Sequence, residues 1–213
     1  MKNIVIIGAG DFGKEVLWLI EDINKEKPTY HILGFLDDDE AKHGKNINGY
    51  TVLGGTSKVI DLNEAQEVCA CIALQDGDVR KKIVERLKKF DKWETLIHPN
   101  VRISDKSQIG KGCILCAGDI VSVDTVVGDF CIFNFNVVIG HDCKVSSFVS
   151  IMSGAVICGN VKIEENCYLA TNSSVVPGKT LRSGSKVGAG SVVIRNVKSG
   201  VTVMGVPAKR VEF

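Results

Sequence analysis

The sequence predicts a chain of two domains that differ in class: a small α/β domain with parallel strands over residues 1–98, followed by a parallel β-helix over residues 99–213. Two observations lead to this prediction. A glycine-rich turn joins an apolar strand to an amphipathic helix at the start of the chain. From Ile103 onward, a large apolar residue recurs at every sixth position.

The composition is that of an ordinary globular chain of 213 residues, of which 45% are hydrophobic and 24% are charged. The formal net charge is +1, so no basic face favours nucleic acid as a partner. The early apolar run Ile4–Ile7 ends at Gly8, which is too short for a signal peptide or a membrane span. We therefore expect a cytoplasmic protein whose eight cysteines are reduced.

The first 98 residues alternate between strand-like and helix-like segments. After the first strand and helix, the pattern predicts a second strand, a buried third strand, a helix and a last strand, in the segments HILGFLDDD, EVCACIAL, DGDVRKKIVERLKKF and ETLIHP. In the second helix, Val79, Ile83 and Leu87 share one face. This order predicts parallel β-α-β units in a Rossmann-like domain, about half the size of a full dinucleotide-binding fold.

The turn GAGDFG places Gly8, Gly10 and Gly13 between the first strand and the first helix. Glycines at this point let backbone N–H groups at a helix start approach a phosphate closely. Asp37 ends the second strand, where an NAD-binding domain has an acid, but no second half for hydride transfer follows. Beside a nucleotide phosphate, two alternatives stay open: NAD, and a tight turn without a ligand.

The second part of the chain repeats with a period of six. The repeated apolar positions are Ile103, Ile109, Leu115, Val121, Val127, Phe133, Ile139, Val145, Ile151, Ile157, Ile163, Leu169, Val175, Leu181, Val187 and Val193. Small or modest side chains follow four residues later, among them Cys113, Thr125, Cys131, Val137, Cys143, Ala155, Cys167, Ser173, Ser185 and Ser191. A period of six fits neither an α-helix nor a hairpin, because inward side chains recur after one short strand and one turn. The pattern predicts a hexapeptide β-helix of about five coils, in which residues one coil apart stack on the same corner.

His141 is the sole histidine after the linker, and Asp142 follows it directly. The hexad beginning at Ile139 puts both residues on a turn, pointing out of the coil. Histidine titrates near neutrality and can act as a general base, and an adjacent carboxylate can fix its tautomer. One coil further on, Gly159 stands at the same corner, where an exposed N–H can bind an oxyanion. The alternative interpretation is a solvated polar turn.

No metal site is predicted. Cys113 and Cys116 lack a second cysteine pair at zinc-site spacing. A γ-type carbonic anhydrase also uses hexapeptide coils, but its metal needs three histidines, so the residue count excludes it. A β-helix that only binds other molecules needs no histidine–acid pair, and it is the non-enzymatic alternative.

Six segments of the chain resemble the nucleotide-sugar acetyltransferases of the PglD and NeuD type: GAGDFG, GFLDDD, ALQDGDVRKKI, LIHP, NFNVVIGHDC and GVPAKRV. The resemblance covers essentially the whole chain. It implies a left-handed β-helix, acetyl-CoA as the co-substrate, and a homotrimer with active sites between neighbouring β-helices. The expected reaction is N-acetylation of a UDP- or dTDP-linked 4-amino-dideoxy sugar for a bacterial surface glycan, with O-acetylation of sialic acid as the alternative.

The resemblance also implies a separate function for each of the two domains. Residues 1–98 are expected to hold the nucleotide sugar, and residues 99–213 to form the acetyltransferase domain with a C-terminal tail. The residues assigned to the nucleotide sugar are Gly8, Gly10 and Gly13 near its phosphates and Asp37 and Asp38 near its base.

In the second domain, the resemblance makes His141 the catalytic base, Asp142 its partner and Asn134 a residue that faces the acceptor site. The chain departs from the family pattern at two positions. Ser150 stands where a second histidine is frequent, and Gln75 stands where family members tend to have glycine. We therefore expect the reaction class to follow the family more closely than the identity of the sugar.

Overall fold

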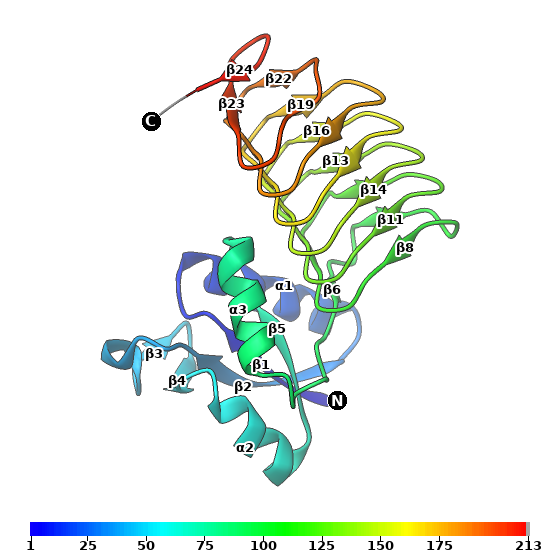
Figure 1. Cartoon of the computed structure of the whole chain (residues 1–213). Coiled ribbons are helices and arrows are strands. Elements are labelled where there is room, and N and C mark those ends of the chain that lie inside the picture. Colours follow the sequence, from blue (N-terminus) through cyan, green and yellow to red (C-terminus); the bar gives the residue numbers. More distant parts are fainter. Residues whose placement is uncertain (212–213) are drawn as a thin grey trace. The chain divides into compact units, whose positions relative to one another are not determined.

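The structure is a computed structural model that describes residues 1–211. The chain forms two compact units, Met1–Pro99 and Asn100–Phe213. The predicted fold class is confirmed, because the first unit is α/β with a mostly parallel sheet and the second is a β-helix (Figure 1). Within residues 1–211, no helix combines the length and the apolar character that a membrane crossing requires.

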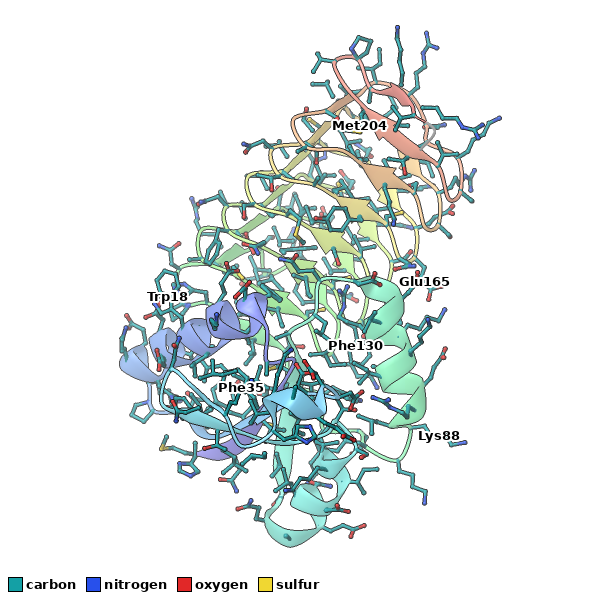
Figure 2. All side chains as sticks on the ribbon, turned by 90° about the vertical axis from the view of Figure 1, so that its left-hand side faces the viewer. Trp18, Phe35, Lys88, Phe130, Glu165 and Met204 are labelled. Atoms are coloured by element: carbon teal, nitrogen blue, oxygen red, sulfur yellow. The ribbon has the colours of Figure 1, made fainter. Side chains whose placement is uncertain are left out.

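The first unit is built on a sheet with the strand order β3-β4-β2-β1-β5. Its elements are β1 (Lys2–Ile7), α1 (Asp11–Glu26), β2 (Tyr30–Leu36), the short 3-10 helix Glu40–Lys42, β3 (Asn46–Ile47), β4 (Tyr50–Gly54), α2 (Lys58–Gln66), β5 (Val68–Ile72) and α3 (Gly77–Arg86). β1 pairs in parallel with both β2 and β5, so the strand order reverses at β1. In open α/β sheets such a reversal opens a crevice at the carboxyl ends of the strands. Phe35 on β2 is fully buried and lies among the packed side chains of this unit (Figure 2).

The structure adds elements to the first unit that the sequence analysis does not assign. β3 and β4 form an antiparallel hairpin around Asn48 and Gly49, whose φ angles of 48° and 94° suit a two-residue turn. The last strand expected in ETLIHP is present as β6 (Leu96–Ile97), but it is two residues long and does not belong to this sheet. The reason is that the chain touches the sheet edge through a single bridge between Ala70 and Trp93 and then leaves it.

The second unit confirms the six-residue register. Each repeated apolar residue is the second residue of a two-residue strand: β7 (Arg102–Ile103), β8 (Gln108–Ile109), β9 (Ile114–Leu115), β10 (Ile120–Val121), β11 (Val126–Val127), β12 (Ile132–Phe133), β13 (Val138–Ile139), β14 (Lys144–Val145), β15 (Ser150–Ile151), β16 (Val156–Ile157), β17 (Lys162–Ile163), β18 (Tyr168–Leu169), β19 (Ser174–Val175), β20 (Thr180–Leu181), β21 (Lys186–Val187) and β22 (Val192–Val193). Strands one coil apart pair in parallel; Val121 lies beside Ile139, and Ile139 beside Ile157. β13, β16, β19 and β22 stack in Figure 1. The antiparallel pair β23 (Thr202–Met204) and β24 (Lys209–Arg210) follows the last coil, with Met204 marked in Figure 2.

The turns of the β-helix share the same period. Every sixth residue has a positive φ: Gly112, Gly118, Asp124, Phe130, Asn136, Asp142, Phe148, Gly154, Asn160, Asn166, Asn172, Gly178, Gly184 and Gly190. Glycine, asparagine and aspartate tolerate this left-handed conformation best. The backbone conformation of Asp142 is therefore a property of the repeat, which fixes the turn that presents its neighbour His141.

Candidate active site

His141 and Asp142 form the turn between β13 and β14. His141 Nδ1 lies 2.7 Å from Asp142 Oδ2, which the left-handed backbone of Asp142 makes possible. The two side chains are 56% and 53% exposed. The turn is anchored to the coils on both sides, since Asp142 N donates to Val123 O and Asn160 N donates to His141 O. With Nδ1–H donating to the carboxylate, the Nε2 lone pair is the one that can accept a proton.

Gly159 lies one coil beyond, against the imidazole. A Cβ atom on this residue would lie 2.5 Å from His141 Cε1 and would collide with Nε2, so no larger residue permits this position of the ring. Gly159, whose N–H we expect to be exposed, is a buried residue against which the imidazole lies. Within residues 1–211, no acceptor takes the Gly159 N–H. A base nitrogen and an available backbone donor therefore lie side by side.

Asn134 lies at another corner of the coil. It follows β12, whereas His141 follows β13, and these two strands belong to different sheets. Asn134 is 5% exposed, and its Oδ1 accepts hydrogen bonds from Phe135 N at 2.7 Å and Ser153 Oγ at 3.0 Å. Ser150 is buried in β15. One chain by itself thus presents the His141 pair and Asn134 on separate edges.

The three glycines of the first unit have different roles. Gly8 has a φ of 109°, and a Cβ atom there would lie 2.8 Å from Ala73 O. A Cβ atom on Gly13 would collide with Gly8 O, so the fold itself requires both glycines. Gly10 has a φ of −102° and nothing within 4 Å of a Cβ position. The absence of a side chain at Gly10 therefore serves no packing need of this chain and leaves open space at the start of α1.

Asp37 holds the glycine turn in place. Its carboxylate accepts hydrogen bonds from Ala9 N at 2.8 Å and Asp39 N at 2.9 Å, and it forms an ion pair with Lys42 at 3.0 Å. Burial acts to raise the pKa of Asp37, but these hydrogen bonds and the Lys42 charge outweigh it and lower the pKa. The carboxylate is thus ionised, and its hydrogen bonds stabilise the loops that contain Ala9 and Asp39.

Asp38 is also held by its surroundings. Its Oδ1 accepts from the N and Oγ1 of Thr56, both at 2.8 Å, and its Oδ2 pairs with Arg86 at 2.6 Å. Burial acts to raise the pKa of Asp38, but the Thr56 hydrogen bonds and Arg86 lower it. Asp37, Asp38 and Gly8 come together in a pocket of about 360 Å³ at the carboxyl ends of β1 and β2.

Three residues that the sequence analysis missed also line this pocket: Thr56, Lys82 and Arg86. The two cations lie on α3 with Val79 and Ile83, and all four line the same pocket. Their spacing of three and four residues places them on one helix face. That spacing was readable in the sequence, because Val79 and Ile83 had already marked the face.

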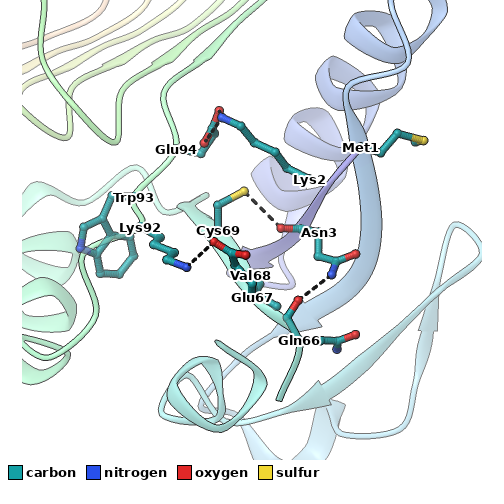
Figure 3. A pocket seen from close by; sticks show the side chains of 10 residues that line it. All are labelled: Met1, Lys2, Asn3, Gln66, Glu67, Val68, Cys69, Lys92, Trp93 and Glu94. Atoms are coloured by element: carbon teal, nitrogen blue, oxygen red, sulfur yellow. Dashed lines mark hydrogen bonds and ion pairs between the residues drawn. The ribbon is translucent and has the colours of Figure 1, made fainter. Parts of the chain in front are cut away.

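A larger pocket of about 520 Å³ lies at the opposite, amino ends of β1 and β5 (Figure 3). Its charged side chains pair with one another, Lys2 with Glu94 and Lys92 with Glu67, each at 2.9 Å. Burial, with the Glu94 charge nearby, raises the pKa of the Cys69 thiol to about 12. This pocket is the larger of the two. Ligands of open α/β sheets bind at the carboxyl ends of the strands, so the smaller pocket is the better candidate for a ligand site.

Seven of the eight cysteines are buried. All eight are free thiols, and burial raises the pKa of Cys71, Cys143 and Cys167. A thiol that stays protonated is a poor nucleophile. Within residues 1–211, no group of three or more histidine, cysteine or acidic side chains is arranged to hold a metal ion.

The profile of a known family, the PglD N-terminal domain, matches residues 3–87. GDP-perosamine N-acetyltransferase of Escherichia coli O157:H7 is 30% identical over 214 residues, which cover 97% of this chain and 95% of that protein. Serine acetyltransferase of Bacillus subtilis is 35% identical over 81 residues, 34% of this chain and 37% of that protein.

Solved structures match the whole chain. Perosamine N-acetyltransferase from Caulobacter crescentus, in a histidine-to-asparagine variant bound to CoA and GDP-perosamine, superposes with a TM-score of 0.92 at 26% identity, covering 100% of this chain and 98% of that one. The acetyltransferase domain of PglB from Neisseria gonorrhoeae FA1090, in complex with acetyl coenzyme A, gives 0.89 at 31% identity and covers 99% of each chain. WeeI from Acinetobacter baumannii AYE gives 0.88 at 30% identity, with 99% and 100% covered.

Proposed function

The chain belongs to the family of nucleotide-sugar N-acetyltransferases with a PglD-type N-terminal domain, and on that premise we propose that it acetylates a nucleotide-linked 4-amino-dideoxy sugar for a bacterial surface glycan. The acetyl donor of this enzyme class is acetyl-CoA. The observation that carries the proposal is the imidazole of His141, held by Asp142 through Nδ1 and lying with Nε2 against Gly159.

In the proposed mechanism, His141 Nε2 accepts a proton from the sugar ammonium group, which frees the lone pair of the amine nitrogen. That nitrogen attacks the thioester carbonyl, and the carbonyl oxygen takes up the negative charge. The Gly159 N–H donates a hydrogen bond to this oxygen. The C–S bond then breaks, the CoA sulfur takes up the proton that the attacking nitrogen loses, and the sugar keeps the acetyl group as an amide. The imidazolium of His141 afterwards releases its proton to solvent. Asp142 stabilises the imidazolium without taking its proton.

The positions of Asn134 and His141 support a homotrimer whose active sites lie between subunits. Both residues are assigned to one acceptor site, yet they lie at different corners of a single coil. In a cyclic assembly, the His141 corner of one subunit meets another corner of its neighbour, which can supply Asn134. Each of the three sites then contains one contribution from each of two chains.

In the first unit, the pocket at the carboxyl ends of β1 and β2 is the proposed site of the nucleotide. Lys82 and Arg86 provide positive charge there for a diphosphate. The open space at Gly10 lets a phosphate approach the start of α1. The family resemblance implies UDP or dTDP, whereas the perosamine enzymes act on a GDP-linked sugar. GDP-perosamine is therefore the first substrate to test.

The decisive assay measures release of free CoA with a thiol reagent. Acetyl-CoA is mixed with GDP-perosamine, with UDP- and dTDP-linked 4-amino sugars, and with sialic acid as the O-acetylation arm. We expect turnover with an amino sugar and none with sialic acid. Turnover with sialic acid alone would contradict N-acetylation, and a lack of turnover with every acceptor would favour a β-helix that only binds.

Mixing two inactive variants tests the shared site. His141→Ala and Asn134→Ala subunits are denatured together and refolded at equal concentration. If each site draws on two chains, random assembly gives an intact site in about a quarter of cases, so activity returns to about a quarter of wild type. No recovery beyond the sum of the two variants would mean that each chain holds a complete site.

A further inference from the structure

Polar side chains inside the β-helix form a repeated ladder of hydrogen bonds. Ser107 Oγ accepts from Thr125 N, 18 residues on, at 3.1 Å and donates to Ser122 O, 15 residues on, at 2.6 Å. Thr125 Oγ1 does the same with Cys143 N at 3.3 Å and Gly140 O at 2.8 Å. The donation 15 residues on is repeated by Cys113, Cys131, Cys143 and Cys167. The rungs of Ser107, Thr125 and Cys113 thus hold both ends of the turn in the next coil.

Asp119 occupies the corresponding position at the third corner, where it is 0% exposed. Its Oδ1 accepts from Val137 N, 18 residues on, at 2.8 Å, which is the accepting half of a rung. Its Oδ2 is buried and has no hydrogen-bond partner among the described residues. The missing half is a donation, which a carboxylate cannot make and a neutral carboxylic acid can.

We propose that Asp119 is a neutral carboxylic acid in the folded protein, that its Oδ2–H donates to the carbonyl oxygen of Asn134, and that it thereby positions Asn134 for the sugar acceptor. The carbonyl lies 15 residues on, as in the rungs of Ser107, Thr125 and the cysteines at the other two corners. At the third corner the Ser173 hydroxyl makes no such bond within residues 1–211, so Asp119 is the residue proposed to make one there. Asp119 then holds both ends of the turn 134–137, through Asn134 C=O and Val137 N–H. Its role as a positioning residue rests on the proposed function of Asn134.

The surroundings of Asp119 favour the neutral form. Burial raises the pKa of Asp119 to about 9, although hydrogen bonds to the backbone of Val137 and Cys116 act in the opposite direction. On the segments that pack against it, the titratable groups are the exposed Arg102 of β7 and the buried Cys116 of its own turn. Neither side chain is among the causes of the shift, to which Cys116 contributes only through its backbone, and β13 carries no ionisable side chain. A buried carboxylate without a partnered charge is costly, so the group keeps its proton.

Infrared spectroscopy tests the protonation state on the wild-type protein and on Asp119→Asn. At neutral pH we expect the wild-type protein to show a C=O stretch of a protonated carboxylic acid, which shifts in deuterated water and is missing from the spectrum of Asp119→Asn. Carbon NMR of the Asp119 carboxyl group across the same pH range provides a second readout. A carboxylate signal for Asp119 at pH 7 would overturn the proposal.

Kinetics test the positioning role, because the asparagine side chain has the shape and the donor and acceptor groups of a neutral aspartic acid. We expect Asp119→Asn to keep the sugar KM within about twofold of wild type. Asp119→Ala should raise the sugar KM about tenfold while the KM for acetyl-CoA stays unchanged. Asp119→Ser offers a hydroxyl like those of Ser107 and Thr125, so its sugar KM should stay closer to wild type than that of Asp119→Ala, and a sugar KM as high as that of the alanine variant would count against the positioning role.

Two outcomes would overturn the positioning role. One is that Asp119→Asn raises the sugar KM as much as Asp119→Ala does. The other is that the alanine and serine variants raise the KM for the sugar and the KM for acetyl-CoA to the same extent. The two proposals also fail separately. If wild type acetylates no nucleotide sugar, the proposed function falls, and the infrared band still decides the protonation of Asp119. If wild type is active and the band is absent, the inference about Asp119 falls alone.

Discussion

The residues proposed for chemistry in the β-helix differ from those proposed for binding in the first unit. His141 and Asp142 lie on a turn with more than half of each side chain exposed, and His141 Nδ1 lies 2.7 Å from Asp142 Oδ2. Asp37 and Asp38 instead accept hydrogen bonds from Ala9 and Thr56, which belong to the framework around them. Substitution in the β-helix site should therefore remove chemistry and spare the fold, whereas substitution in the first unit should affect both.

The largest fall in kcat is expected for His141→Ala. Loss of a general base should lower kcat by about 10²–10⁴-fold, and His141→Asn should fail similarly because it keeps shape but not basicity. The melting temperature should stay within about 2 °C, because an exposed turn side chain contributes little to the coil. Val123→Ala, one coil earlier at the same corner, is the matched control. A kcat within about threefold of wild type would place the base elsewhere.

The second-largest fall in kcat is expected for Gly159→Ala. The added methyl group collides with His141 Nε2, so the imidazole must move, and a displacement of about 1 Å can cost about 10²-fold in kcat. In a His141→Ala background the same change should cost almost nothing, because there is no ring to displace. An equal loss in both backgrounds would show that Gly159 acts independently of the imidazole.

Asp37→Ala should lower the stability of the first unit by about 1.5–3 kcal/mol, because two backbone N–H groups lose a charged acceptor. Lys42→Ala should cost less, since it removes only the ion pair. Urea unfolding measures the loss, and hydrogen exchange at Ala9 and Asp39 locates it. Unchanged stability together with a raised sugar KM would mean that Asp37 serves the ligand and not the loop.

The two units should respond to pH in opposite directions. The lowered pKa values of Asp37 and Asp38 provide stability that is present above their unfolded pKa values and is lost as pH falls through the folded ones. The raised pKa of Asp119, about 9, provides stability that is present below its unfolded value and is lost as pH rises toward 9.

Hydrogen exchange resolved by unit measures this difference. The β-helix should lose up to about 1.4 kcal/mol per pH unit between pH 6 and 9, and Asp119→Asn should abolish the loss. Acid should weaken the first unit before the β-helix. A wild-type β-helix with constant protection across this alkaline range would contradict a raised pKa at Asp119.

The smallest effect on stability is expected for Gly10→Val, whose side chain enters open space. The sugar KM should rise about fivefold or more, with the KM for acetyl-CoA nearly unchanged, if a phosphate approaches Gly10 closely. Calorimetry with nucleotide sugars and with NAD provides the control. Binding of NAD that is tighter than that of any nucleotide sugar would favour a dehydrogenase-like domain.

The sequence predicted the β-helix better than the first unit. A period of six constrains every residue from Ile103 to Val193, so the strands, the stacking and the turn at His141 followed from one register. The first unit has no period, and the hairpin at Asn48–Gly49 and helix α2 were missed although the Asn-Gly pair is a hairpin signal. Lys82 and Arg86 were missed as well. The sequence predicted the helix face on which they lie, but it did not predict the pocket that this face lines.

The sequence by itself determined which residue types recur and at what spacing, because side-chain direction in a coil depends only on position within the hexad. The tertiary structure decided which atoms meet. It placed Gly159 against Nε2 of His141 and the Ala9 N–H in hydrogen-bond contact with Asp37. It also buried Asp119 with one carboxyl oxygen hydrogen-bonded and the other without a hydrogen-bond partner among the described residues. These contacts depend on distances between coils and loops that lie far apart in the chain, and no local pattern fixes them.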